Sequence, residues 1–231
     1  MDSTKIKQLA FDLGADLCGI GAVDRFTDAP EGFHPRDVLP GCRSVIMLAR
    51  RFNHSTLLAQ STSPYTVTRN DISMRMNTLA TGLSEALDRA GCCAVPIGSV
   101  GPDEYDEKSE KFRGTISLKH AAMLAGLGKM GKNTLLINNR YGNMVWLSAV
   151  LTTVELDQDA LADYEVCPPG CSLCLKNCPV QALDSITINQ MACWEHAFGV
   201  KNGGEWKIHC FTCRKICPNR LGLKAAAQSS R

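Results

Sequence analysis

Apolar residues recur with helical spacing in three segments of the chain. Near its start, four of them fall on one helical face before Gly14, a residue typical of helix ends: Ile6, Leu9, Ala10 and Leu13. The clearest helix is predicted over residues 71–90, where Gly91 ends it. Its apolar face is formed by six residues: Ile72, Met76, Leu79, Leu83, Leu87 and Ala90. A shorter helix is predicted over residues 115–125.

Other segments carry the apolar runs that are typical of strands. They cover residues 15–22, 43–49, 92–97 and 143–156. Pro96 lacks a backbone donor, so its strand is expected at a sheet edge or a bulge. The polar residues 101–114 are predicted to form a solvated loop, with a lid over a site as the alternative.

The order of these elements predicts the fold class. Helices and strands alternate up to about residue 160, and the acidic, irregular residues 157–165 indicate a boundary. We therefore expect an α+β protein with a layered α/β domain over residues 1–160 and a second domain over residues 161–231.

Charge and hydropathy exclude several functional classes. The net charge of +2 does not indicate nucleic-acid binding. No apolar run approaches the length of about 18 residues that a membrane helix needs. The first residues lack the apolar core of a signal peptide, and Arg50-Arg51 lies too far along the chain for an export signal. We expect a cytoplasmic protein with no membrane and no nucleic-acid partner.

Cysteine use changes this ordinary picture. The chain has 12 cysteines, and eight of them fall between Cys167 and Cys217. A secreted disulfide scaffold would be dense in cysteine throughout, whereas the first 160 residues resemble a reduced core. The clustered thiols are therefore predicted to bind metal.

The eight cysteines form two groups, each of which ends in Cys-Pro. The first group contains Cys167, Cys171, Cys174 and Cys178. The second contains Cys193, Cys210, Cys213 and Cys217. Cys-Pro endings resemble those of bacterial two-cluster ferredoxins, where the last cysteine of each run binds the other cluster. We therefore assign one [4Fe–4S] cluster to Cys167, Cys171, Cys174 and Cys217. The second cluster is assigned to Cys178, Cys193, Cys210 and Cys213.

Two departures from the ferredoxin spacing leave an alternative open. Pro168-Pro169-Gly170 widens the first gap, and an insertion separates Cys193 from Cys210. Structural zinc also uses paired cysteines, although Cys-Pro endings are not typical of zinc sites. His209 is either a ligand of a variant site or, in our preferred interpretation, a hydrogen-bond donor or an exposed side chain.

A glycine motif precedes the cysteines. Residues 126–131 (GLGKMG) match a dinucleotide fingerprint, but a helix rather than a strand is predicted before them. With Lys132 they nearly form a phosphate loop, but Asn133 stands where magnesium binding needs serine or threonine. The glycines let the backbone approach a flat or bulky group, or they allow close helix packing.

The order of this loop and the two cysteine groups is familiar. The run 120–136 (HAAMLAGLGKMGKNTLL), followed by the paired cysteine motifs, resembles the epoxyqueuosine reductase family and its relatives, the cobalamin-dependent reductive dehalogenases. The resemblance covers roughly residues 70–220. It implies a nitroreductase-like N-terminal domain that holds a corrinoid (cobalamin) base-off, followed by a two-cluster ferredoxin-like domain. The residues implied to line the corrin are Gly126, Gly128, Gly131, Lys132, Asn133 and Thr134.

The chain also departs from that family. Residues 94–99 (AVPIGS) lack the carboxylate that epoxyqueuosine reductases carry as a proton donor, so no catalytic acid is identified. The chain stops shortly after Cys217, without the helical-repeat domain that binds tRNA, which predicts a short member that does not reduce a tRNA base. Four basic residues near the end are predicted to be solvated: Arg214, Lys215, Arg220 and Lys224.

Three functional hypotheses follow. The first is an iron–sulfur oxidoreductase or electron donor whose two [4Fe–4S] clusters reduce a bound corrinoid. The second is a ferredoxin-like carrier that docks a redox partner protein and binds no small-molecule cofactor. The third, a flavin in the N-terminal domain, is tested by the fluorescence of acid-released flavin.

Overall fold

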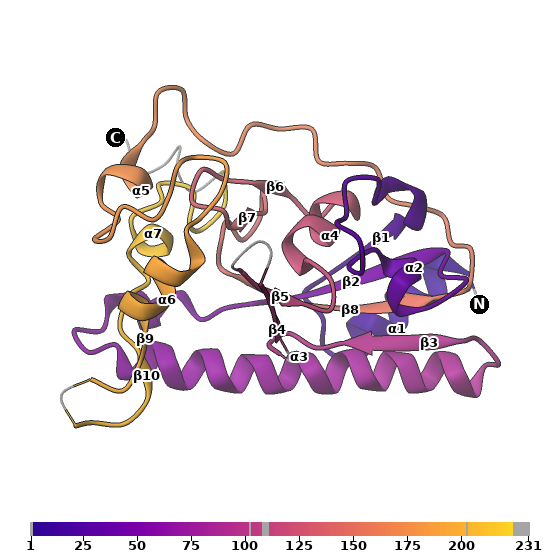
Figure 1. The fold of residues 1–231 in the computed structure, drawn as a ribbon. Helices are drawn as coiled ribbons and strands as arrows, with labels where there is room; N and C mark the ends of the chain where they lie inside the picture. Colours follow the sequence, from indigo (N-terminus) through magenta and orange to yellow (C-terminus); the bar gives the residue numbers. More distant parts are fainter. Residues whose placement is uncertain (1, 102, 108–110, 202, 224–231) are drawn as a thin grey trace. The chain divides into compact units, whose positions relative to one another are not determined.

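The computed structural model describes residues 2–101, 103–107, 111–201 and 203–223. The chain divides into two compact units, each assembled from three segments (Figure 1). The first unit comprises Met1–Arg51, Ile72–Gly128 and Trp146–Asp163. The second comprises Phe52–Asp71, Lys129–Val145 and Tyr164–Arg231. The cysteine-rich segment thus forms a unit together with two segments from earlier in the chain.

The first unit contains most of the regular structure. Its helices are α1 (Ser3–Asp12), η1 (Val23–Arg25), α2 (Pro35–Val38), the larger part of α3 (Ser63–Arg89) and α4 (Leu118–Leu124). Its strands are β1 (Leu17–Ala22), β2 (Ser44–Arg51), β3 (Ala94–Ile97), β4 (Asp103–Asp106), β5 (Lys111–Gly114) and β8 (Val145–Thr152). These bounds confirm the predicted strands and the first and third predicted helices to within a few residues.

A four-stranded sheet in the order β1-β2-β8-β3 organises the first unit. Pairing is antiparallel between β1 and β2, with Leu17 opposite Ala49, and between β3 and β8, with Ala94 opposite Thr152. The central strands β2 and β8 are almost wholly buried, which explains their continuous apolar sequences. Strand β3, which contains Pro96, lies at the sheet edge, as predicted.

Helices cover both faces of this sheet, with α3 and α4 on opposite sides (Figure 1). The Ser148 hydroxyl donates to the backbone oxygen of Met76 on α3, at 3.1 Å. On the other side, a side chain at Gly19 would collide with the backbone oxygen of Ala125, just after α4. Glycine in β1 therefore permits the close packing of α4.

Two sequence predictions are wrong. Helix α3 begins at Ser63, eight residues before the predicted start, because its first turns are largely polar and carry no apolar period. Strands β4 and β5 pair as an antiparallel hairpin where a solvated loop is predicted. Arg113 and Asp106 pair at 3.1 Å on this hairpin, so two of the charges that indicated solvent exposure satisfy each other.

The second unit is built from short elements. They are η2 (His54–Leu58), the start of α3, β6 (Lys129–Met130), β7 (Leu136–Ile137), α5 (Leu173–Lys176), α6 (Gln190–Ala197), β9 (Phe198–Gly199), β10 (Lys207–Ile208) and α7 (Thr212–Lys215). The Tyr65 ring, at the start of α3, stacks on Phe211 with the ring centroids 4.0 Å apart. The backbone N–H of Ile208 donates to the Thr66 hydroxyl at 3.0 Å. These contacts fix the start of α3 within this unit.

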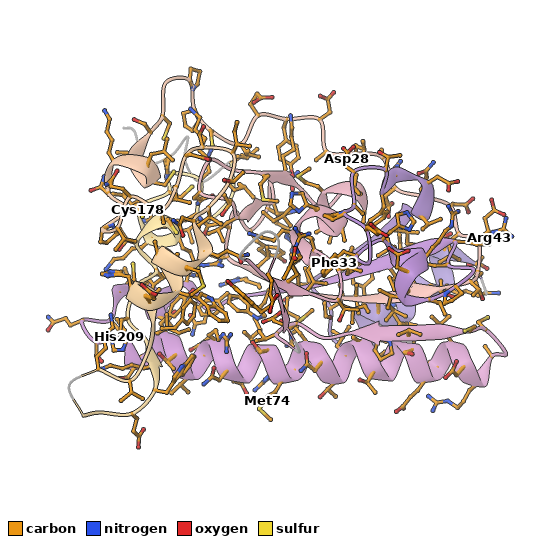
Figure 2. The ribbon with its side chains drawn as sticks, in the orientation of Figure 1. Asp28, Phe33, Arg43, Met74, Cys178 and His209 are labelled. Atoms are coloured by element: carbon orange, nitrogen blue, oxygen red, sulfur yellow. The ribbon has the colours of Figure 1, made fainter. Side chains whose placement is uncertain are left out.

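The longest helix shows how exposure divides a single element. On α3, Met76 is fully buried, whereas Met74 is 70% exposed and projects outward (Figure 2). Among the described residues, no helix has both the length and the apolar character needed to cross a membrane.

Candidate iron–sulfur centre

Each cysteine group is built around a helix of one turn. Helix α5 carries Cys174 and follows Cys171, while α7 carries Cys213 and follows Cys210. The two helices contact each other. Such a turn brings cysteines spaced by three positions to one side of the backbone, and the Cys-Pro that follows each helix leads the chain away. The repeated local structure matches the repeated spacing in the sequence.

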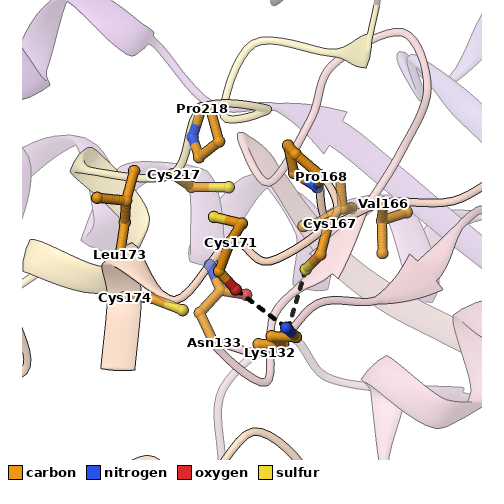
Figure 3. Close-up of a pocket in the computed structure, with 11 residues that line it drawn as sticks. Lys132, Asn133, Val166, Cys167, Pro168, Cys171, Leu173, Cys174, Cys217 and Pro218 are labelled. Carbon is orange, nitrogen blue, oxygen red and sulfur yellow. Dashed lines mark hydrogen bonds between the residues drawn. The ribbon is translucent and has the colours of Figure 1, made fainter. Parts of the chain in front are cut away.

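Four cysteines from two distant segments line one pocket in the second unit (Figure 3). They are Cys167, Cys171, Cys174 and Cys217. The structure thus brings together the four thiols that the sequence assigns to one cluster. The rest of the lining is mainly apolar and includes Ile137, Val166 and Leu173. Ile137 and Val166 also pack in a buried cluster with Cys217.

Burial governs the chemistry of these thiols. It raises the pKa of the Cys217 thiol to about 11, and the neighbouring thiols of Cys167 and Cys174 add to the rise. Burial also raises the pKa of Cys174, where Cys167 and Cys171 contribute. Without a cation these groups remain protonated and unreactive, whereas a bound metal would hold them as thiolates. Among the described residues, no group of three or more histidine, cysteine, aspartate or glutamate side chains meets the geometry for a single metal ion.

The second set of cysteines is only partly assembled by the contacts of the structure. Burial raises the pKa of the Cys213 thiol to about 11, and the nearby thiols of Cys193 and Cys210 raise it further. The fourth predicted member, Cys178, follows α5, and its Sγ accepts a hydrogen bond from the backbone N–H of Ala182 at 3.2 Å. The role of Cys178 as a ligand of this set stays a prediction.

His209 lies beside Cys210 in the chain. Its Nε2 is 3.0 Å from the backbone oxygen of Gly199, a geometry that suits a ring N–H donor. This contact supports the interpretation of His209 as a hydrogen-bond donor rather than a metal ligand through the same nitrogen.

The glycine motif falls where the chain passes from one unit to the other. Helix α4 precedes it, as predicted, so the strand that a dinucleotide fingerprint requires is missing there. Gly126 has φ +76°, and a side chain on it would collide with the backbone oxygen of Ala160. This glycine therefore serves close packing, which is one of the two roles left open by the sequence.

Lys132 and Asn133 face the cysteines. The backbone N–H of Lys132 donates to the Sγ of Cys167 at 3.5 Å, and its ammonium donates to the backbone oxygen of Cys171 at 3.0 Å (Figure 3). The Asn133 side-chain N–H donates to the backbone oxygen of Cys213 at 3.2 Å. The sequence does not predict these contacts, because their partners lie 35 to 80 positions further along the chain.

Arg214 differs from its prediction. The sequence predicts a solvated side chain, but Arg214 is buried, and its guanidinium donates to the backbone oxygen of Asn143. Asn143 in turn donates from Nδ2 to the backbone oxygen of Arg214 at 3.3 Å. Burial is tolerated because the cation is hydrogen-bonded, and it lies near Cys213, where it lowers the pKa of the thiol against the effect of burial. Lys215 is exposed as expected, Arg220 is half-buried, and Lys224 lies outside the described residues.

Sequence comparison places these features among known proteins. No family model matches the chain. It is 30% identical over 212 residues to an epoxyqueuosine reductase of Gloeobacter violaceus, a match that covers 80% of this chain and 59% of that protein. The chain therefore spans about three fifths of the length of this relative.

Solved structures share the fold. The epoxyqueuosine reductase of Streptococcus thermophilus superposes with a TM-score of 0.66 at 18% identity, covering 95% of this chain and 66% of that one. A reductive dehalogenase, described in connection with B12-dependent dehalogenation, superposes with a TM-score of 0.64 at 17% identity, covering 97% and 32%.

The fold and the thiol-lined pocket define a mixed helix-and-sheet protein with a candidate metal centre. Within that class, the chain is a relative of the epoxyqueuosine reductases and shares its fold with the cobalamin-dependent reductive dehalogenases, as the order of its motifs indicated.

Proposed function

We propose that this chain is an iron–sulfur electron-transfer oxidoreductase with two [4Fe–4S] clusters. One cluster is held by Cys167, Cys171, Cys174 and Cys217. The other is held by Cys178, Cys193, Cys210 and Cys213. The observation that carries the proposal is the pocket in which four thiols from two distant segments meet. Four cysteine thiolates are the donor set of a [4Fe–4S] cluster, so the residues present fit this group.

The residues of this protein would hold the two clusters, exclude water from them and polarise their surroundings. When bound, the clusters supply one-electron transfer. The one-turn helices α5 and α7 position Cys174 and Cys213. Ile137 and Val166 exclude water from one side of the pocket, which strengthens every electrostatic interaction inside it.

A corrinoid held base-off by residues 1–160 is the electron acceptor that we propose. The fold shared with a B12-dependent dehalogenase supports it. The contacts of the glycine loop support it less, because Gly126 packs against Ala160, and Lys132 and Asn133 donate to backbone oxygens of the cysteine segments. Because these three residues make contacts within the protein, they do not fit a surface that lines a corrin ring, and no chemical step is derived through the corrinoid.

A titration with cob(II)alamin tests the acceptor. The protein is purified anaerobically, its iron and sulfide are measured, and the cobalt EPR spectrum is followed as the protein is added. Loss of the nitrogen superhyperfine splitting would support base-off binding. An unchanged spectrum from protein with full clusters would leave the second hypothesis, a carrier that docks a redox partner protein.

The substrate is a separate question for experiment. The relatives are named for epoxyqueuosine, and one solved relative is described with an epoxyqueuosine-modified tRNA stem loop. The sequence prediction for this chain is that it does not reduce a tRNA base and binds no nucleic acid. Reduction of epoxyqueuosine in tRNA by the cluster-loaded protein would contradict that prediction, whereas no turnover beside an active reductase control would support it.

A further inference from the structure

The loop Gly131–Thr134, here the Lys132 loop, contacts both cysteine groups with polar atoms. Lys132 reaches Cys167 and Cys171, and Asn133 reaches Cys213. Asn133 is 3% exposed, and its Oδ1 accepts a hydrogen bond from the backbone N–H of Leu135 at 3.2 Å. Because its amide donates at one end and accepts at the other, Asn133 holds the loop in a defined orientation.

The loop geometry also depends on Gly131. Its backbone N–H donates to the Leu135 oxygen at 2.9 Å, and the Thr134 N–H donates to the Gly131 oxygen at 2.8 Å. A Cβ on Gly131 would lie 2.6 Å from the Ile137 side chain and 2.8 Å from Asn133 Oδ1. A side chain at this position would displace the ends of the Ile137 and Asn133 side chains, so glycine suits the turn that precedes Lys132.

Lys132 is electrostatically distinctive in the pocket. Of the described residues that line it, only Lys132 has a basic side chain, and none is a carboxylate. The half-buried ammonium is anchored on a backbone oxygen, Cys171 O, which leaves its positive charge uncancelled by that partner.

We propose that Lys132 sets the reduction potential of the cluster bound by Cys167, Cys171, Cys174 and Cys217, an inference that rests on the proposed function. Reduction adds one electron, and hence one negative charge, to a cluster already surrounded by thiolates. A nearby ammonium and an N–H···S bond to Cys167 stabilise the reduced form more than the oxidised form. Through the position of its charge, Lys132 raises the reduction potential of this cluster.

The test is an EPR-monitored redox titration of anaerobically purified wild-type and variant proteins. In Lys132→Gln the charge is lost, and one of the two reduction steps is expected to shift to a more negative potential. The ratio of reduced to oxidised cluster at a fixed potential should fall roughly tenfold. Lys132→Arg keeps the charge, so its ratio of reduced to oxidised cluster should return most of the way to the wild-type value.

Lys129→Gln is the matched control. It removes the same charge three positions earlier, from a side chain that pairs with Glu165 at 3.0 Å and does not line the pocket. Both reduction steps of this variant should stay at their wild-type potentials. Unchanged potentials in Lys132→Gln, with iron and sulfide at wild-type levels, would overturn the inference.

Two further measurements separate the possible failures. A wild-type protein that binds zinc rather than iron and sulfide would overturn the proposed function itself. If Lys132→Gln cannot hold its clusters, the wild-type protein and Lys132→Arg are each labelled with 15N at the backbone nitrogen of their lysines. The reduced wild-type cluster should then show a 15N coupling that Lys132→Arg lacks, and its absence from the wild type would overturn the inference.

Discussion

At the scale of single residues, the cysteines differ more than their spacing indicates. Cys217 is buried and packs with Ile137 and Val166, whereas Cys93, which falls in a predicted strand segment, is exposed. The thiols of Cys167 and Cys174 lie close enough to Cys217 to raise its pKa. Cysteine therefore occupies two environments in this chain. Of the two, only the buried environment of Cys217 brings several thiols to one metal centre.

This difference predicts the outcome of a pair of substitutions. Cys217→Ser should lose one cluster, so that iron falls from about eight to about four atoms per chain, because the first pocket then has three thiols. Cys93→Ser should keep the wild-type iron content. The measurement is iron and acid-labile sulfide on anaerobically reconstituted protein, and full content in Cys217→Ser would contradict the assignment.

Arg214 shows why local sequence could not decide the environment of a charged residue. Its guanidinium is buried because it donates to the backbone oxygen of Asn143, 71 positions away, and Asn143 donates back to the Arg214 oxygen. Its neighbour Lys215 is exposed. Two adjacent basic residues indicate a solvated segment unless a distant partner is known, and the sequence does not name that partner.

At the scale of elements, α3 illustrates what periodicity can and cannot predict. Its apolar face from Ile72 to Leu87 is buried as the helical spacing indicates, but Ala90, just past its end, is exposed. The turns that begin at Ser63 escaped prediction because they are held by Tyr65 on Phe211 rather than by an apolar period of their own.

Two methionines on this helix provide a matched test of the packing. Met76→Ala removes a fully buried side chain and should lower the free energy of unfolding by about 2–5 kcal/mol, because it leaves a cavity. Met74→Ala removes a side chain that is 70% exposed and should change it by less than about 0.5 kcal/mol. Denaturant unfolding monitored by circular dichroism measures both, and equal effects would contradict the packing of α3.

At the scale of the whole molecule, the two units have different sources of stability. The first unit has a four-stranded sheet with buried central strands. The described residues of the second form the start of α3, short helices and two-stranded pairs. Since metal binding can supply folding free energy to segments with little regular structure, the second unit is expected to depend on the clusters that we propose for it.

Removal of the clusters should therefore loosen one unit selectively. After oxidative loss of iron, backbone amides of residues 166–217 should exchange hydrogen faster, while those of β1 and β2 should keep their protection. Hydrogen exchange with mass spectrometry compares the loaded and stripped proteins. Equal loss of protection in both units would show that the clusters stabilise the whole chain, and no loss in either would show that they have no structural role.

The sequence by itself determined the features that depend on near neighbours. The helical and strand periods located the strands of the four-stranded sheet, α1, α4 and the larger part of α3. The Cys-Pro groups, by their resemblance to those of two-cluster ferredoxins, predicted which four thiols the structure brings to one pocket. Only the tertiary structure decided the β4–β5 hairpin, the burial of Arg214 and the aim of Lys132 at the thiols. The physical reason for the last two is sequence separation: Lys132 and Asn133, for example, meet partners 35 to 80 positions away, and such contacts leave no local pattern in the sequence.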